Sequence, residues 1–166
     1  MYKYLLFILF CVSPVLKAQE LNKIVIDEKS EKPMLIGYCD RTAFQDTNFA
    51  WWFNSEYNNY KVDTIQIGCI RDLVNNYKIV IVMGTWCSDS RREVPRLYKI
   101  LDELNFSEEN IDVINVNRKK EGLADEVKNL DIELVPTIIF YLNDEEVGRI
   151  IETPETTLER DMKEIL

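Results

Sequence analysis

The sequence predicts one α/β domain in which helices flank a mixed central β-sheet. Short apolar runs at 79–83, 111–116 and 137–142 are typical of buried strands. A helical pattern separates the first two runs, so these strands should be parallel. A tight turn leads from the third run to a fourth strand over 145–151, so the last two strands should be antiparallel. Helices are expected on both faces of this sheet.

Length and composition fit a single globular domain and exclude several function classes. The 166 residues are 46% hydrophobic and 30% charged, which is enough apolar surface for a packed core. The formal net charge of −9 argues against nucleic acid or an anionic membrane as a partner. The chain has no histidine, which excludes a Cys-His protease and a histidine zinc site. We expect no metal, nucleotide or other cofactor.

Residues 1–18 have the pattern of an export signal. Lys3 precedes an apolar segment at 4–12, and Ala18 stands before the expected cleavage point. A permanent membrane anchor would need about 20 apolar residues, more than this segment supplies. A bulky residue before Cys11 disfavours lipid attachment there. The signal predicts an exported protein, periplasmic or secreted, that leaves the membrane once the signal is removed.

Residues 19–77 are expected to form a helical N-terminal extension packed on a core at 78–166. The extension begins with an apolar alternation at 24–26, which is either an edge strand or a loosely docked lead-in. A second helical segment is expected over 65–77. Between them, large aromatics recur at helical spacing and should pack a helix on the sheet rather than line a groove. These aromatics are Phe49, Trp52, Phe53, Tyr57 and Tyr60.

Four local predictions concern the remainder of the core. The spacing of apolar residues over 123–130 predicts a short helix. The basic cluster at 117–120 is expected to be a solvated turn rather than an anion site. Thr153 is suited to cap the last helix, with a proline in the first helical position. Pro95 lies inside the first core helix and should kink it.

Cys87 is the candidate reactive residue. It lies where the buried strand at 79–83 gives way to a helix, and the helix N-terminus stabilises an anion such as a thiolate. The negative charge of Asp89 opposes the thiolate form. The charges of Arg91 and Arg92 partly offset it.

Two further cysteines, Cys39 and Cys69, belong to the predicted exported chain. In an oxidising compartment they could form a disulfide that leaves Cys87 free. The alternative is that both are small buried apolar residues. The sequence does not decide between these two interpretations, because it does not give the distance a disulfide requires.

Three motifs resemble those of the thioredoxin-like family. The segment W-C-S-D-S at 86–90 looks like the family's W-C-x-x-C motif. Pro95 stands eight residues after Cys87, where the family has a helix-kinking proline. Val135-Pro136-Thr137 matches the family's cis-proline loop. The stretch at 85–95 also resembles a subgroup of exported bacterial thioredoxin-like proteins.

The resemblance implies a thioredoxin fold over the core and a cis bond between Val135 and Pro136 beside Cys87. In the family, this loop exposes the backbone before the proline to an extended substrate segment. Trp86, Val135 and Pro136 are therefore the candidate substrate-binding residues. Cys87 and Ser90 are the candidate catalytic residues.

The sequence also departs from the family in two places that bear on catalysis. Ser90 stands where the family has its second cysteine, so it can donate a hydrogen bond to the Cys87 thiolate but cannot form a disulfide. The family's buried carboxylate, six residues before the first cysteine, is replaced by Ile81. The first change indicates a single-thiol site, and the second removes the family's proton acceptor.

Two functions remain in view. The first is a monothiol exchange enzyme in which Cys87 forms mixed disulfides with protein or small-thiol substrates. An external reducing thiol, or Cys39 or Cys69 if close, would resolve them. The second is a non-catalytic adaptor that holds a partner in the cis-proline groove, with Cys87 idle or peroxide-sensing.

Overall fold

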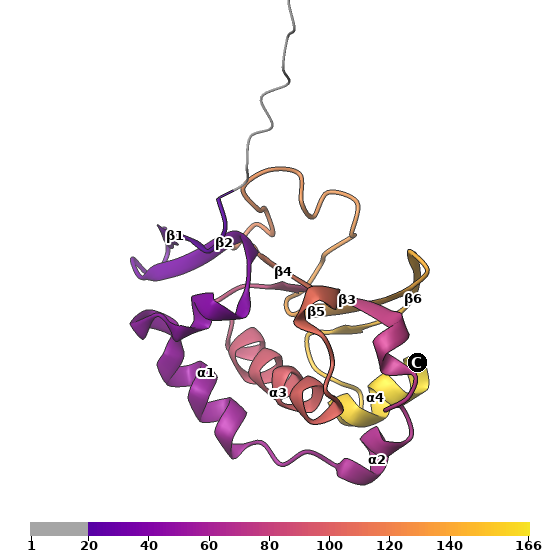
Figure 1. Cartoon of the computed structure of the whole chain (residues 1–166). Helices are drawn as coiled ribbons and strands as arrows, with labels where there is room; N and C mark the ends of the chain where they lie inside the picture. Colours follow the sequence, from indigo (N-terminus) through magenta and orange to yellow (C-terminus); the bar gives the residue numbers. More distant parts are fainter. Residues whose placement is uncertain (1–19) are drawn as a thin grey trace, which may run out of the picture.

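A computed structural model describes residues 20–166 of the chain, so the predicted export signal and Cys11 lie outside the described residues. Six strands form one sheet in the order β1-β2-β4-β3-β5-β6 (Figure 1). The strands are β1 (Lys23–Ile26), β2 (Pro33–Cys39), β3 (Tyr77–Met83), β4 (Ile111–Asn115), β5 (Thr137–Leu142) and β6 (Glu145–Ile151).

The sheet is mixed, as the sequence predicts. Strands β3 and β4 run parallel, whereas β5 is antiparallel to both β3 and β6. A register shift interrupts the β5–β6 ladder between Phe140 and Tyr141, next to Gly148 of β6. Every residue of β3 from Ile79 to Met83 is buried, in agreement with its unbroken apolar run.

The extension contributes two strands as well as helices. Strand β1 is an edge strand, which decides between the two interpretations of the alternation at 24–26. Strand β2 was not predicted, and it lies between β1 and β4, antiparallel to each. The predicted helical segment over 65–77 is a short α-helix followed by turns and a 3-10 turn.

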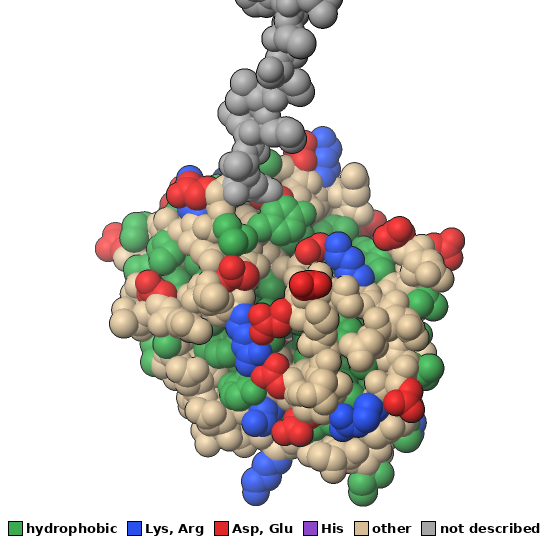
Figure 2. All heavy atoms as spheres, in the orientation of Figure 1, with side chains coloured by type: hydrophobic (Ala, Val, Ile, Leu, Met, Phe, Trp, Pro, Cys, Tyr) green, Lys and Arg blue, Asp and Glu red, His purple; other side chains and the backbone are tan. Residues whose placement is uncertain are grey.

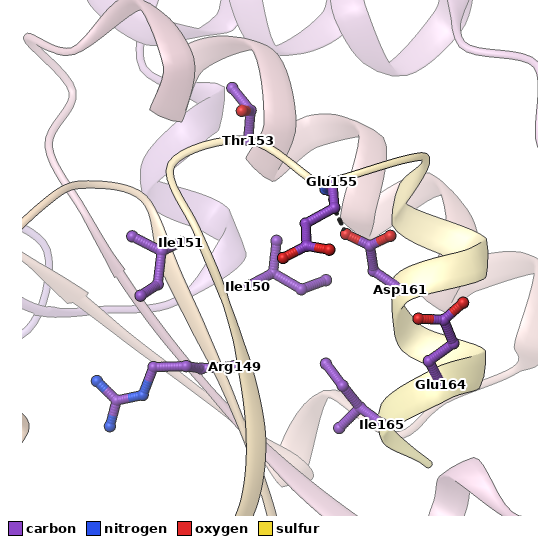
Figure 3. A pocket seen from close by; sticks show the side chains of 8 residues that line it. All are labelled: Arg149, Ile150, Ile151, Thr153, Glu155, Asp161, Glu164 and Ile165. Atoms are coloured by element: carbon purple, nitrogen blue, oxygen red, sulfur yellow. Dashed lines mark hydrogen bonds between the residues drawn. The ribbon is translucent and has the colours of Figure 1, made fainter.

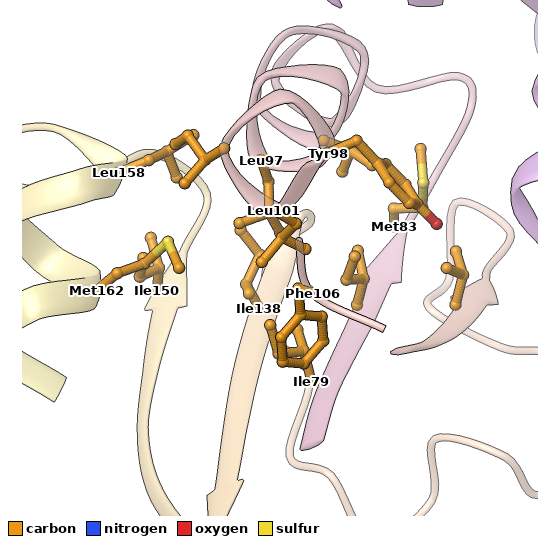
Figure 4. Close-up of a cluster of buried hydrophobic side chains, with 14 of the residues drawn as sticks. Ile79, Met83, Leu97, Tyr98, Leu101, Phe106, Ile138, Ile150, Leu158 and Met162 are labelled. Carbon is orange, nitrogen blue, oxygen red and sulfur yellow. The ribbon is translucent and has the colours of Figure 1, made fainter. Parts of the chain in front are cut away.

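Four α-helices lie on one face of the sheet (Figure 1). They are α1 (Thr47–Asn59), α2 (Thr64–Gly68), α3 (Ser88–Leu104) and α4 (Leu158–Ile165); short 3-10 turns cover Arg41–Gln45, Val74–Asn76 and Glu108–Asn110. Figure 4 shows how Leu97, Tyr98 and Leu101 of α3 lie over side chains of the strands, with Leu158 and Met162 of α4 beside them. Pro95 lies within α3.

The aromatic residues of α1 pack into this core, as expected. Phe53 stacks on Phe44 with ring centres 4.9 Å apart, and it also contacts Tyr98 of α3. Phe49 and Trp52 are likewise buried. These rings hold α1 against α3 and so tie the extension to the core.

The opposite face of the sheet is covered by an irregular segment, which corrects two predictions. Within the described residues all α-helices lie on one face, and no helix forms over 123–130. The carboxylate of Glu126 instead accepts hydrogen bonds from the backbone N–H groups of Leu123 and Ala124. Such local bonds compete with helical ones. Val127 and Leu130 still pack against the sheet, so their spacing reflects burial without a helix.

The last helix begins four residues later than predicted. Its N-cap is Thr157, whose hydroxyl accepts a hydrogen bond from the Arg160 N–H at 3.3 Å. Thr153 belongs to the preceding loop, which Asp161 holds by accepting hydrogen bonds from the N–H groups of Glu155 and Thr156. The carboxylate in the first turn therefore fixes the loop that the sequence assigned to the helix.

None of the helices described within residues 20–166 is both long and apolar enough to cross a bilayer.

Candidate functional site

Cys87 occupies the turn between β3 and α3. It is the N-cap residue of α3, it is half-buried, and its backbone N–H donates to the Gly84 carbonyl at 2.9 Å. A Cβ at Gly84 would lie 2.6 Å from the Trp86 indole, so the glycine lets that ring fold back over the turn. The turn therefore presents the Cys87 thiol at the helix N-terminus.

The loop before β5 meets this turn. The Cys87 thiol donates a hydrogen bond to the Val135 carbonyl oxygen at 3.1 Å, and the peptide bond between Val135 and Pro136 is cis. The Trp86 indole N–H donates to the Val116 carbonyl at 2.8 Å. The structure thus brings Trp86, Cys87, Val135 and Pro136 to the same end of the sheet.

Ser90 lies one turn along α3 and is fully buried. Its hydroxyl oxygen accepts a hydrogen bond from the Gly84 N–H at 3.2 Å. Ser90 therefore braces the turn that carries Cys87. Its hydrogen bond to the Cys87 thiolate stays a prediction.

Arg91 is a charged neighbour of Cys87 on α3. Its Nε–H donates to the Thr85 carbonyl, which holds the half-buried guanidinium against the strand-to-helix turn. Burial lowers the pKa of Arg91, and the nearby Cys87 thiolate opposes that shift. The Arg91 guanidinium is therefore a cation at the turn that carries the reactive thiol.

Arg118 corrects the prediction that the basic cluster at 117–120 is only a solvated turn. Its guanidinium lies over the Trp86 ring, 4.8 Å from the ring centre, and donates three hydrogen bonds to the Asp27 carboxylate. The hydrogen bonds to Asp27 raise the pKa of Arg118, and the Cys87 thiolate adds to this rise. Arg118 is therefore part of the surroundings of the thiol.

Asp27 is the buried acidic partner in this arrangement. Hydrogen bonds from Arg118 hold the pKa of the Asp27 carboxyl well below its usual range, and bonds from Ser30 add to this against the opposing effect of burial. Asp27 follows β1 directly. The N-terminal hairpin formed by β1 and β2 thus supplies a carboxylate that binds Arg118, and Arg118 in turn interacts with Cys87.

The same hairpin contacts the site at a second point. The Leu35 N–H of β2 donates to the hydroxyl of buried Thr85 at 3.1 Å, and Thr85 in turn holds Arg91 through its carbonyl. Sequence reasoning missed Asp27 and Thr85 as residues of the site. No sequence signal pairs Asp27 with Arg118, because 91 positions separate them.

The other two cysteines do not pair. Cys39 and Cys69 are both free thiols. Cys39 is buried in the core on the helix side of the sheet, where burial raises its pKa to about 12. Cys69 is exposed at the end of α2. The disulfide interpretation is thus not supported, and the buried apolar interpretation holds for Cys39 alone.

Two cavities lie near the sheet edges. A pocket of about 300 Å³ lies between β6 and α4, and its lining includes Glu155, Asp161 and Glu164 but no residue of the Cys87 site (Figure 3). A larger cavity of about 430 Å³ adjoins Asp27 and Arg118 under the N-terminal hairpin. Acidic and basic side chains are interspersed over the face drawn in Figure 2.

A thiol at the strand-to-helix turn, hydrogen-bonded to a cis-proline loop at the same end of a mixed sheet, defines a thioredoxin-fold protein with one site cysteine. The family model for thioredoxin matches residues 69–164, more than half of the chain. The chain therefore belongs to the thioredoxin family. The match begins nine residues before the predicted core boundary at position 78.

Solved structures resemble this chain at low sequence identity, and the first of those that follow supports the shared fold. A protein of unknown function from Pseudomonas aeruginosa is 18% identical with a TM-score of 0.51, covering 75% of this chain and 77% of that one. Thioredoxin O2 from Arabidopsis thaliana is 16% identical with a TM-score of 0.38, over 68% and 82% of the two chains. Mitochondrial thioredoxin 3 from Saccharomyces cerevisiae is 20% identical with a TM-score of 0.40, over 66% and 98%. No curated protein matches the chain.

Proposed function

We propose that this protein is a monothiol thiol–disulfide exchange enzyme. The Cys87 thiol loses its proton to solvent, and the thiolate attacks one sulfur of a substrate disulfide. A new disulfide forms between Cys87 and that sulfur, and the other substrate sulfur leaves as a thiolate. An external thiolate then attacks the substrate-derived sulfur of the mixed disulfide, so that a disulfide forms between the external thiol and that sulfur while Cys87 leaves as the thiolate.

The observation that carries this proposal is the setting of the Cys87 thiol. It caps α3, it is half-buried, and it lies beside Arg91 and Arg118. A helix N-terminus and nearby cationic groups are the surroundings in which reactive cysteines occur in proteins. The thiolate is the nucleophile in disulfide exchange.

The positions of the other cysteines support an external resolving thiol. Cys39 belongs to the buried cluster on the helix side of the sheet, whereas Cys87 packs against the cluster on the opposite face. Cys69 lies at the end of α2, on the helix side. Ser90 carries no sulfur. A small thiol from solution is therefore the resolving group in this proposal.

We propose that the exchange takes place after export, in the periplasm or outside the cell. The pattern of residues 1–18 supports this location. The substrates would be disulfides of proteins or small thiols, reduced at the expense of an external reducing thiol. Nucleic acid and membrane are not partners in this scheme, which accords with the net charge of −9.

The adaptor function has one specific observation in its favour. The Cys87 thiol donates its hydrogen bond to the Val135 carbonyl, the group that the family offers to an extended substrate. In an adaptor this contact would persist, and a partner would bind without any reaction at sulfur.

Turnover separates the two functions. A glutathionylated peptide is incubated with the protein and excess glutathione, and peptide release is followed over time. We expect release faster than with glutathione alone, and we expect the Cys87→Ser variant to lower the rate to that background. Equal rates for the two proteins would favour the adaptor.

A further inference from the structure

Arg91 stands out among the arginines of α3. Arg92 and Arg96 each form ion pairs with carboxylates, whereas Arg91 forms none within residues 20–166. Its one side-chain hydrogen bond is the neutral contact from Nε to the Thr85 carbonyl. A half-buried guanidinium without a carboxylate partner is costly, because burial disfavours the charged form.

The charges around Cys87 leave Arg91 as the uncompensated cation. Arg118 also interacts electrostatically with the thiolate, but its charge is balanced by the three hydrogen bonds from its guanidinium to Asp27. The Nε–H bond to the Thr85 carbonyl and the backbone bond from the Arg91 N–H to the Cys87 carbonyl hold Arg91 at the turn that carries the thiol, and Arg118 repels the Arg91 charge. The Cys87 thiolate, once formed, is therefore the counter-charge that the described residues offer to Arg91.

Disulfide exchange removes that counter-charge. When the Cys87 thiolate forms a bond to a substrate sulfur, its negative charge leaves with the departing thiolate. Arg91 is then half-buried beside a neutral disulfide. A carboxylate on the substrate half that stays attached would restore the balance, and a neutral or cationic half would not.

We propose that Arg91 selects disulfide substrates that carry a carboxylate close to the reacting sulfur. This inference rests on the proposed exchange function and names its substrate class. The preference runs against the net charge of −9, which repels anions from the protein as a whole. A faster reaction with anionic disulfides would therefore come from the local charge of Arg91 and not from the net charge of the protein.

The test compares three small disulfides that differ mainly in charge: dithiodipropionate, hydroxyethyl disulfide and cystamine. Each disulfide is added in excess to the reduced full chain. Mass spectrometry then measures the rate at which the adduct forms on Cys87. Rates are divided by those of free cysteine with the same probe, which removes intrinsic reactivity. We expect dithiodipropionate to react about fivefold faster than the neutral probe, the size of one charge pair at about 4 Å in water.

Two substitutions of Arg91 and one control substitution test whether the preference for the anionic probe comes from Arg91. Arg91→Gln should abolish the preference for the anionic probe, and Arg91→Lys should keep much of it, because it retains the charge. Arg92→Gln is the matched control, since Arg92 is already paired with Asp89 and Glu93. It should leave the ratio of the three rates within about twofold. Added salt should weaken the preference in the unmodified protein.

The outcomes are distinct. Equal normalised rates for the three probes, or a preference that survives Arg91→Gln, would overturn the role of Arg91 while leaving exchange intact. A Cys87 that reacts with none of the probes faster than free cysteine does would overturn the proposed exchange function, and this inference with it.

Discussion

Asp27 and Arg118, 91 positions apart in the sequence, form an ion pair through three hydrogen bonds of 2.9, 3.1 and 2.7 Å at the edge of the Cys87 site. The pair joins the N-terminal hairpin to the loop after β4. Because the Arg118 guanidinium also lies over Trp86, the hairpin fixes a charge next to the reactive turn. The extension is therefore part of the site and not only a cover for the core.

Removing the Asp27 carboxylate should destabilise the protein. Asp27→Asn leaves Arg118 partly buried without its counter-charge, and the Arg118 side chain is 33% exposed. We expect a loss of about 2 kcal/mol in the free energy of unfolding, below the cost for a fully buried pair because water screens the arginine. Urea unfolding measures the loss. The exposed pair of Asp125 and Lys128 supplies the control, since Asp125→Asn should change the stability by less than about 0.5 kcal/mol.

The same ion pair should make the free energy of unfolding depend on pH in the acid range. The folded-state pKa of Asp27 lies below its unfolded value of about 4. Its contribution is therefore complete above that unfolded pKa and is lost as the pH falls toward the folded pKa. We expect the stability difference between the unmodified protein and Asp27→Asn to shrink as the pH falls from 5 to about 2. A difference that is constant over this range would mean that Asp27 is not ionised in the folded protein.

The core of the fold could be predicted because its signals are local. The apolar run at 79–83 indicates a strand buried on both faces, and the tight turn after 142 fixes an antiparallel pair. Cys87 could be placed for the same reason, since the strand, the turn and the helix pattern are adjacent in sequence.

The rest could not be predicted because it depends on contacts between distant residues. Strand β2 is defined by its pairing with β4, and Asp27 gains its role only through Arg118. The segment at 123–130 has helical spacing, but Glu126 binds its own neighbouring backbone, and the apolar residues reach the sheet without a helix. The spacing of apolar residues indicates which of them are buried. Tertiary contacts determine whether the backbone that carries them is helical or irregular.

Alkylation should separate the three cysteines. Cys39 is buried and its pKa is raised to about 12 by burial, so its thiol stays protonated and inaccessible at pH 8. Cys69 and Cys87 should react with iodoacetamide in the native protein, and Cys39 only after unfolding. Peptide mapping by mass spectrometry gives the order. Rapid labelling of Cys39 in the native state would contradict its placement in the core.

Restoring the second thiol should give the protein an internal release step. Ser90→Cys puts a thiol one helical turn from Cys87, at the position of the family's second cysteine. We expect the variant to release a bound substrate without an external thiol and to form a disulfide with Cys87. It should also lose stability, because Ser90 is fully buried and its hydroxyl accepts the Gly84 N–H. Continued dependence on external thiol would show that position 90 does not reach Cys87.

The most direct test of the account is to trap the mixed disulfide. Reduced protein is mixed with a disulfide substrate in the absence of external thiol, and intact and peptide masses are recorded over time. We predict that one adduct per chain accumulates on Cys87, persists, and disappears when glutathione is added. The absence of an adduct on Cys87, or its spontaneous release through a disulfide with Cys39 or Cys69, would contradict the monothiol account.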